Sequence, residues 1–205
     1  MELIRISDNP TELESRIKKT LTSGGVVALP TDTVYGLFSL PNEKAAIEKI
    51  YTLKMRPDSM PLPLLISGTE QLSYVSSFQN QILKTLVGAF WPGPLTVILP
   101  SPSPSMSLIA SAENTIAVRC PNNDLVRRIA NDLGPLAATS ANIHGKETPE
   151  TASEIADMLP NVDLIADGGP LKDGLASTLV DLTQLVPQIL REGPITEKMI
   201  ITSLE

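Results

Sequence analysis

Lys54 and Arg56 stand two residues apart, and Pro57 follows them directly. An Arg guanidinium grips phosphate oxygens with two parallel N–H groups, and a Lys ammonium acts as a point charge, so this pair suits a polyphosphate ligand. The same two cations would also favour the C-terminal end of a helix, where they complement the helix dipole. Both interpretations stay open on these residues alone.

Two segments carry hydroxyl, carboxylate and amide side chains that could bind a nucleotide or another small ligand. Residues 30–37 read Pro-Thr-Asp-Thr-Val-Tyr-Gly-Leu and follow an apolar run, at the kind of strand end where open α/β sheets place ligands. A plain turn held by its own Thr and Asp side chains is the alternative. In residues 138–145, Ser140, Asn142 and backbone N–H groups are suited to cradle a nucleotide. A triad of Ser140 with His144 is disfavoured, because no G-x-S-x-G motif is present.

Arginines at predicted strand ends form a further set of candidates. Arg119 shares a strand face with Thr115, and a buried Arg needs an anionic partner, either a protein carboxylate or a substrate carboxylate. The adjacent Cys120 is interpreted as a small buried hydrophobe. Arg191 ends a later strand, and a glycine-rich segment leads to Ser177. Neither a Walker A motif nor G-x-G-x-x-G occurs, so nucleotide binding would need another device.

The elements that must position these residues alternate between strand and helix. Apolar runs predict strands at 3–6, 26–29, 62–66, 95–99, 115–118, 136–138, 164–166, 178–182 and 188–190. Helical periodicity predicts a helix that starts at Asn9-Pro10, a second capped by Asn42, and further helices around 82–87, 125–133 and 195–204. Thr151 and Glu154 form a capping-box pattern that opens one more helix. Residues 91–96 predict a stiff turn, and 101–107 a surface loop. The pattern predicts a mixed α/β fold with about seven strands, in one domain over 1–205.

Composition excludes several classes of function. The chain has 205 residues, one Cys and one His, which rules out a disulfide framework and a zinc site of the common Cys/His kind. A net charge of −7 argues against a generic polyanion binder, and one Trp, three Tyr and three Phe argue against a stacking platform for single-stranded nucleic acid. The absence of a long apolar run or secretory signal predicts a cytoplasmic protein with no membrane segment.

Taken in order, these segments resemble the YrdC family, the threonylcarbamoyl-AMP synthases. The matching segments are 30–37, Lys54-x-Arg56-Pro57, 91–96, Val118-Arg119-x-Pro121, Thr139-Ser140-Ala141-Asn142-x-x-Gly145, 168–181 and Leu190-Arg191-Glu192-Gly193. The resemblance implies a YrdC-like fold, a twisted mixed sheet with surrounding helices and a concave cavity. It also implies that L-threonine, bicarbonate or CO2, and ATP are converted to L-threonylcarbamoyladenylate and pyrophosphate, the first step of tRNA N6-threonylcarbamoyladenosine formation.

The resemblance also implies partners and a role for each matching residue. Mg2+ is expected with the ATP substrate, and no protein-bound metal or organic cofactor. A separate threonylcarbamoyl-transferase complex would take the product, and tRNA or double-stranded RNA is a candidate partner. The implied L-threonine contacts are Thr33, Arg119, Ser140 and Ser177, and the implied ATP contacts are Lys54, Arg56, Thr115, Asn142 and Arg191. The implied catalytic set is Lys54, Arg56, Ser140 and Asn142.

Some residues depart from the family pattern. They are Asp32 in place of a usual Glu, Met60 and Leu65 where hydrogen-bonding residues are common, His144 in place of Ser, and Glu150 near a site where a hydroxyl would meet ATP. Two alternatives to the synthase therefore stay open. One is a non-catalytic nucleotide- or RNA-binding paralogue, and the other is a related enzyme that forms a different carbamoyl-adenylate. The negative net charge disfavours direct tRNA binding in any of them.

Overall fold

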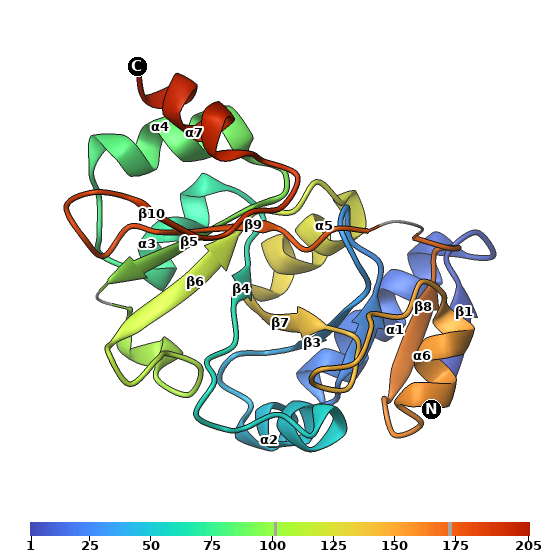
Figure 1. The fold of residues 1–205 in the computed structure, drawn as a ribbon. Helices are drawn as coiled ribbons and strands as arrows, with labels where there is room; N and C mark the ends of the chain where they lie inside the picture. The colour runs from blue at the N-terminus through green and yellow to red at the C-terminus, as the bar shows by residue number, and fades with distance from the viewer. Residues whose placement is uncertain (101, 172–173) are drawn as a thin grey trace.

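A computed structural model describes residues 1–100, 102–171 and 174–205, and its strands form one ten-stranded sheet in the order β1-β8-β2-β3-β7-β4-β6-β5-β9-β10 (Figure 1). The pairs β1–β8, β8–β2, β4–β6 and β5–β9 are parallel and the other five are antiparallel. The strands are β1 (Glu2–Arg5), β2 (Val27–Leu29), β3 (Gly36–Ser39), β4 (Leu64–Leu65), β5 (Leu95–Pro100), β6 (Thr115–Arg119), β7 (Leu136–Ser140), β8 (Leu164–Asp167), β9 (Thr178–Asp181) and β10 (Gln188–Arg191).

The mixed α/β class is confirmed, but the sheet has ten strands rather than about seven. Each of the nine predicted strand segments overlaps one observed strand, and β3 was not predicted. A plain turn over all of residues 30–37 is wrong at its end, because β3 begins at Gly36 within that segment. All four residues of β3 are buried, and the strand pairs with β2 on one side and β7 on the other. A short strand that is buried on both faces has no alternation of apolar and polar residues. The sequence pattern therefore could not distinguish β3 from the polar loop that precedes it.

Seven α-helices and two 3-10 helices surround the described part of the sheet. They are α1 (Pro10–Thr22), α2 (Lys44–Lys54), α3 (Leu72–Val75), α4 (Gln81–Phe90), α5 (Asp124–Leu133), α6 (Ala152–Met158) and α7 (Glu197–Leu204), with the 3-10 turns η1 (Thr69–Gln71) and η2 (Pro104–Met106). The predicted loop 101–107 therefore contains a 3-10 turn, and its residue 101 lies outside the described residues. None of the helices in the described ranges is long and apolar enough to cross a membrane.

The helix ends follow local hydrogen bonding. The Asn9 side chain accepts a hydrogen bond from the backbone N–H of Glu12 at 3.2 Å, as expected for the cap of α1. The predicted capping box of α6 is confirmed, with Thr151 and Glu154 in the two roles. The predicted cap Asn42 is wrong, because α2 starts at Lys44 and the cap position falls to Glu43, which makes no side-chain capping bond. The short helices at 69–75 were not predicted.

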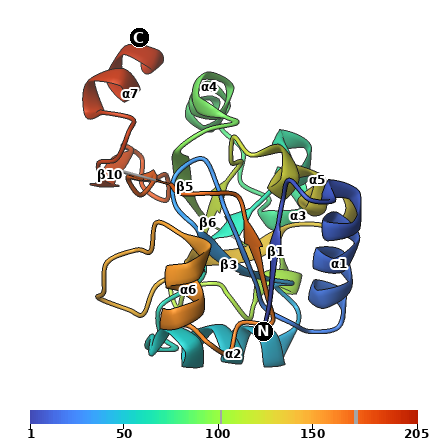
Figure 2. The same cartoon turned by 90° about the vertical axis from the view of Figure 1, so that its right-hand side faces the viewer.

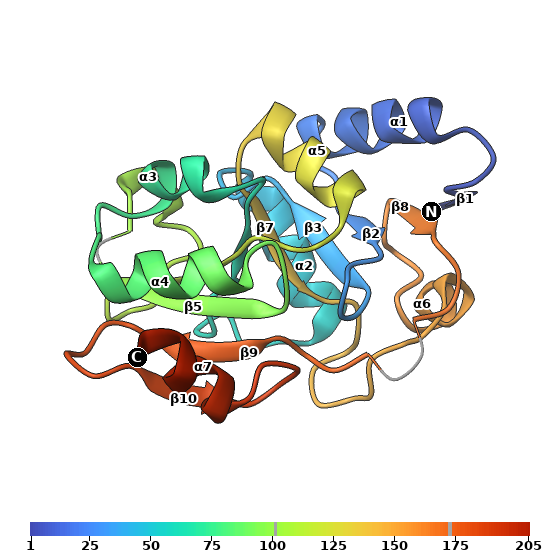
Figure 3. The same cartoon turned by 90° about the horizontal axis from the view of Figure 1, so that it is seen from above.

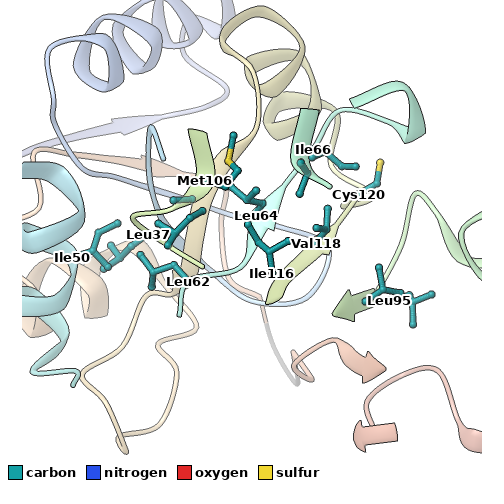
Figure 4. Close-up of a cluster of buried hydrophobic side chains, with 14 of the residues drawn as sticks. Leu37, Ile50, Leu62, Leu64, Ile66, Leu95, Met106, Ile116, Val118 and Cys120 are labelled. Carbon is teal, nitrogen blue, oxygen red and sulfur yellow. The ribbon is translucent and has the colours of Figure 1, made fainter. Parts of the chain in front are cut away.

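Two hydrophobic clusters cover opposite faces of the sheet. Leu13 and Ile17 of α1 pack with Ile129 of α5 in one cluster, and these two helices lie side by side (Figure 3). The larger cluster joins the strands to α2, α4, α6 and α7, and Figure 4 shows part of it around Leu64 and Val118. In Figure 2, α7 and α1 lie at opposite sides of the molecule.

Strand alternation places the candidate residues on one face. Leu136 and Ala138 belong to the cluster under α1 and α5, so Ser140, two residues further along β7, faces the same way. Val118 of β6 belongs to the opposite cluster, so its neighbour Arg119 and the more distant Thr115 face the side of Ser140. The polar residues of β6 and β7 thus share the sheet face that α1 and α5 partly cover.

Candidate functional site

Lys54 is the last residue of α2, and its ammonium is buried among backbone and amide oxygens. The residue is 1% exposed. Its Nζ donates to the carbonyl oxygens of Ser140 at 2.5 Å and Asn142 at 2.6 Å, and to Asn142 Oδ1 at 3.0 Å. Burial, followed by the charge of Arg56, lowers the pKa of Lys54 to about 7. The structure therefore brings the predicted residues Lys54, Ser140 and Asn142 together.

Asn142 closes the turn that follows β7. Its Oδ1 accepts a second hydrogen bond from Ser140 Oγ at 2.5 Å, and its Nδ2 donates to the carbonyl of Lys146 at 2.6 Å. The Ser140 hydroxyl is therefore directed to Asn142, and the exposed His144 makes no side-chain bond with it in the described structure. This arrangement agrees with the sequence argument against a Ser140–His144 pair.

Arg56 lies just beyond the end of α2. Met55 has a left-handed backbone with φ of 50°, which ends the helix and turns the chain before Arg56. One terminal nitrogen of Arg56 donates to the carbonyl of Pro61 at 3.0 Å, while its buried Nε–H has no partner among the described residues. Burial lowers the pKa of the Arg56 guanidinium. A half-buried cation with an unused donor is suited to an anionic ligand.

Arg119 ends β6 and is 5% exposed. Its Nε donates to the carbonyl of Gly93 at 2.9 Å, Nη1 donates to Thr33 Oγ1 at 2.8 Å, and Nη2 pairs with Asp32 Oδ1 at 2.5 Å. Burial lowers the pKa of Arg119, and the Asp32 carboxylate opposes that effect. Of the two partners left open by the sequence, a protein carboxylate is the one that the structure contains.

The loop between β2 and β3 presents Thr33 to Arg119. Thr31 Oγ1 donates to the carbonyl of Val34 at 2.6 Å and lies 3.0 Å from Thr33 Oγ1. Gly174 approaches this loop so closely that a Cβ built on it would lie 2.1 Å from the carbonyl oxygen of Thr33. Asp32 and Gly174 are functional candidates that the residue-by-residue prediction did not assign. Their signals, a carboxylate beside Thr33 and a glycine in the 168–181 segment, were present in the sequence.

Ser177 and Arg191 form a second contact group beside Arg119. Ser177 Oγ lies 2.7 Å from Thr96 Oγ1, and Arg191 donates from Nε to the carbonyl of Ser177 at 3.0 Å and from Nη2 to its hydroxyl at 3.4 Å. The charge of Arg191 is close enough to contribute to the lowering of the Arg119 pKa. Arg191, assigned by resemblance to ATP, therefore contacts a residue assigned to L-threonine.

Thr115 lies apart from Arg119, at the other end of β6. It bonds locally, with its Oγ1 2.7 Å from Ser111 Oγ. Leu64 of β4 pairs with Val118 in parallel and with Ala137 antiparallel. Thr115, three residues before Val118, and Ser140, three residues after Ala137, therefore lie at the same end of the sheet. The predicted ATP contacts Thr115 and Asn142 thus lie at one end of the sheet, on β6 and just after β7, with β4 between these two strands.

The structure also shows the surroundings of Cys120 and of three residues that depart from the family pattern, Met60, Leu65 and Glu150. Leu65 is buried in β4 opposite Arg119, and the carbonyl of Met60 accepts a hydrogen bond from the Tyr51 hydroxyl at 2.8 Å. Cys120 is buried, and burial raises the pKa of its thiol to about 11, as expected for a small core residue. Glu150 is exposed, and its backbone N–H bonds the Glu154 carboxylate at 2.8 Å.

Two surface hollows lie outside these groups. One of about 560 Å³ lies against α1 and α5 and is lined by residues such as Glu70 and Arg127. The other, of about 470 Å³, includes Arg16, Lys49 and Asp163. Neither is lined by the candidate residues, so the concave cavity implied by the family resemblance stays a prediction at this site.

Comparison with known proteins supplies a family context. The Sua5_yciO_yrdC family profile, described as "Telomere recombination", matches residues 19–193. The chain is 35% identical over 194 residues to a Pyrococcus abyssi protein named "Threonylcarbamoyl-AMP synthase", with 93% of this chain and 57% of that protein covered. It is 38% identical over 183 residues to a Bacillus subtilis protein of the same name, with coverages of 88% and 53%. The chain thus spans somewhat more than half the length of these two relatives.

A solved structure shares the fold over almost the whole chain. "Crystal structure of P. abyssi Sua5 complexed with L-threonine" superposes with a TM-score of 0.90 at 32% identity, covering 99% of this chain and 60% of that chain. That protein binds L-threonine, and the sheet and helices described above are similar to its own.

Proposed function

Because this chain belongs to the Sua5–YciO–YrdC family, we propose that it is an L-threonylcarbamoyladenylate synthase. In this proposal it joins L-threonine, bicarbonate or CO2, and ATP, and it releases pyrophosphate. The product would serve a separate transferase complex that modifies an adenosine of tRNA, and the setting would be the cytoplasm. The proposal is supported by two relatives that carry the synthase name and by a structural neighbour that binds L-threonine.

In the proposed site, L-threonine lies beside Arg119, Thr33 and Ser177. A guanidinium has five N–H groups, and three of those of Arg119 are used by Gly93, Thr33 and Asp32. Two remain, so Arg119 can bind a substrate carboxylate while it keeps Asp32. The hydroxyls of Thr33 and Ser177 are suited to hold the polar groups of the amino acid, and Ser140 lies further along the same sheet face.

The reaction needs positioning more than acid–base chemistry. The ammonium group of L-threonine gives one proton to water, and the amine nitrogen then forms a bond to the carbon of CO2 as one C=O electron pair moves to oxygen. Loss of a second proton from nitrogen to water leaves the carbamate. A carbamate oxygen then forms a bond to the α-phosphorus of ATP, and the bond from that phosphorus to the β-phosphate bridging oxygen breaks. Pyrophosphate leaves with that electron pair. Because both reactants are anions, buried cations that hold them together supply much of the catalysis.

ATP would bind beside Arg56, Asn142 and the exposed Arg191, with Thr115 near the same end of the sheet as Asn142. The Mg2+ travels with the ATP phosphates as part of the substrate. One observation carries the assignment of ATP. The buried Nε–H of Arg56, two residues after Lys54 of the Lys54–Asn142 cluster, has no hydrogen-bond partner in the described structure. Buried donors normally have an acceptor, and a phosphate oxygen of bound ATP would be the acceptor for this one.

The test is pyrophosphate release from MgATP with bicarbonate, with and without L-threonine, and with L-serine alongside. We expect release that requires both L-threonine and bicarbonate, and we expect Arg56→Ala to abolish it. Arg5→Ala is the matched control. The Arg5 side chain is exposed, and its carboxylate contact, with Asp167, is long at 4.0 Å. Unchanged release in Arg56→Ala would remove Arg56 from the ATP site.

A non-catalytic paralogue is the second candidate function. It is favoured by Met60 and Leu65, which offer no hydrogen-bonding side chain where one is common in the family; Leu65 is also buried opposite Arg119. If folded wild-type protein releases no pyrophosphate with either amino acid, this candidate replaces the synthase. Binding of ATP without turnover would then be measured by calorimetry.

A further inference from the structure

The three N–H groups of Lys54 already have three protein acceptors. An ammonium has three donors and no acceptor. Ser140 and Asn142 supply the three oxygens at 2.5, 2.6 and 3.0 Å, and the residue is 1% exposed. A phosphate oxygen would have to displace one of these bonds, because no N–H of the ammonium is left without an acceptor. Lys54 is therefore poorly placed to be a ligand of ATP.

The backbone of Lys54 holds the same turn as its side chain. The N–H of His144 donates to the carbonyl of Lys54 at 2.7 Å. This single residue at the end of α2 is thus bonded to positions 140, 142 and 144 of the turn after β7. Asn142 extends the network to Ser140 and Lys146.

Arg56 follows Lys54 across the turn that ends α2. The left-handed Met55 ends the helix, and the N–H of Arg56 donates to the carbonyl of Tyr51 at 3.0 Å. The side chain of Lys54 points inward to the turn, whereas Arg56 keeps a buried Nε–H without a partner in the described structure. The two cations of the motif therefore have different environments. The N–H groups of Lys54 all have protein acceptors, whereas the Nε–H of Arg56 has none among the described residues.

We propose that Lys54 is a positioning residue that binds the 140–146 turn to the end of α2 and so sets Ser140 and Asn142 against Arg56, rather than a ligand of the ATP phosphates. The inference deepens the proposed synthase activity and rests on it for the identity of the ligand. It assigns phosphate contact to Arg56 and loop geometry to Lys54.

The first test uses hydrogen exchange of the ligand-free protein, measured by NMR at the His144 amide. We expect about tenfold faster exchange in Lys54→Met, because the turn loses the side-chain bonds that hold it. Arg56→Met should change the rate less than about twofold, and so should Lys44→Met, whose side chain is 74% exposed on the same helix. An unchanged His144 rate in Lys54→Met would overturn the inference.

The second test uses activity and the conservative variant. Lys54→Arg should fail to restore kcat/KM for ATP, because a guanidinium fork does not fit among acceptors arranged around one buried nitrogen. The Kd for L-threonine should rise by a smaller factor than the KM for ATP in both Lys54 variants, since Arg119 and Thr33 are held by other contacts and Ser140 is the one L-threonine contact that Lys54 bonds. Full activity in Lys54→Arg would instead indicate a phosphate ligand and overturn the inference.

A third measurement covers the case in which Lys54→Met does not fold. Pyrophosphate is added to the wild-type protein while the side-chain nitrogen resonances are followed. We expect the Arg56 Nε–H signal to move and the Lys54 Nζ signal to stay; the reverse would overturn the inference. Wild-type protein that releases no pyrophosphate contradicts the proposed function alone, because the exchange experiment needs neither turnover nor ligand.

Discussion

Arg119 and Asp32 form an ion pair inside the protein, with side-chain exposures of 6% and 13%. Removing one partner of such a pair leaves the other charge buried without compensation. We expect Asp32→Asn to lower the free energy of unfolding by about 3 kcal/mol, measured by urea denaturation at pH 7. The physical reason is that an amide can accept a hydrogen bond from Arg119 but cannot neutralise its charge.

Asp124→Asn is the matched control for this prediction. Asp124 is 84% exposed and lies 3.7 Å from Arg127, so its pair is solvated. Its loss should change the free energy of unfolding by less than about 0.5 kcal/mol. Equal effects of the two substitutions would mean that the Arg119–Asp32 pair is no more important to stability than a surface pair.

Single residues divide into those that the sequence could identify and those that it could not. The types and spacing of Lys54, Arg56, Ser140 and Asn142 were enough to group them, and the structure brings three of them into one network. The different roles inferred for Lys54 and Arg56 depend on which nitrogen is buried against carbonyl oxygens. Carbonyl groups are present at every residue, so no sequence pattern marks them as acceptors.

At the scale of elements, the loop between β2 and β3 is held in place by the glycine-rich segment before β9. A Cβ on Gly174 would lie 2.1 Å from the carbonyl oxygen of Thr33, and backbone cannot yield as a flexible side chain does. We expect Gly174→Ala to move Thr33 away from Arg119 and to weaken L-threonine binding at least about fivefold, measured by calorimetry. Binding of a non-hydrolysable ATP analogue should change less than about twofold.

Gly88→Ala supplies the control, because a Cβ at that position in α4 meets no atom within 4 Å. Alanine in a helix interior should raise the free energy of unfolding by about 0.5–1 kcal/mol and leave L-threonine binding unchanged. If Gly174→Ala binds L-threonine as well as Gly88→Ala does, the contact between Gly174 and Thr33 does not position the proposed site.

Elements with strong local signals were predicted well. The cap and apolar face of α1 and the capping box of α6 are encoded within a few residues of each helix, and both are confirmed. The start of α2 and the presence of β3 depend on distant partners, since β3 exists through its pairing with β2 and β7. Pairing across more than 100 residues, such as Leu37 with Thr139, leaves no local pattern to detect.

At the scale of the whole molecule, most Lys and Arg side chains lie within 4.0 Å of a carboxylate or bond protein oxygens at the candidate site. The chain carries 16 Lys and Arg against 23 Asp and Glu. Eight of those cations pair with carboxylates among the described residues: Arg5, Arg16, Lys18, Lys44, Lys49, Arg119, Arg127 and Arg128. Lys54, Arg56 and Arg191 bond protein oxygens at the candidate site.

Affinity for RNA depends on cations that release counterions from phosphates, and few remain here for that purpose. We therefore expect the protein to bind tRNA with a Kd weaker than about 10⁻⁵ M at about 0.15 M salt, measured by fluorescence anisotropy. The dependence of log Kd on log salt should be shallow, with a slope of about 2 or less, because each phosphate contact adds about one unit. A Kd below about 10⁻⁶ M with a steep slope would show a basic surface that the ion pairs do not predict, and it would favour the RNA-binding paralogue over a synthase that releases a small adenylate to a separate complex.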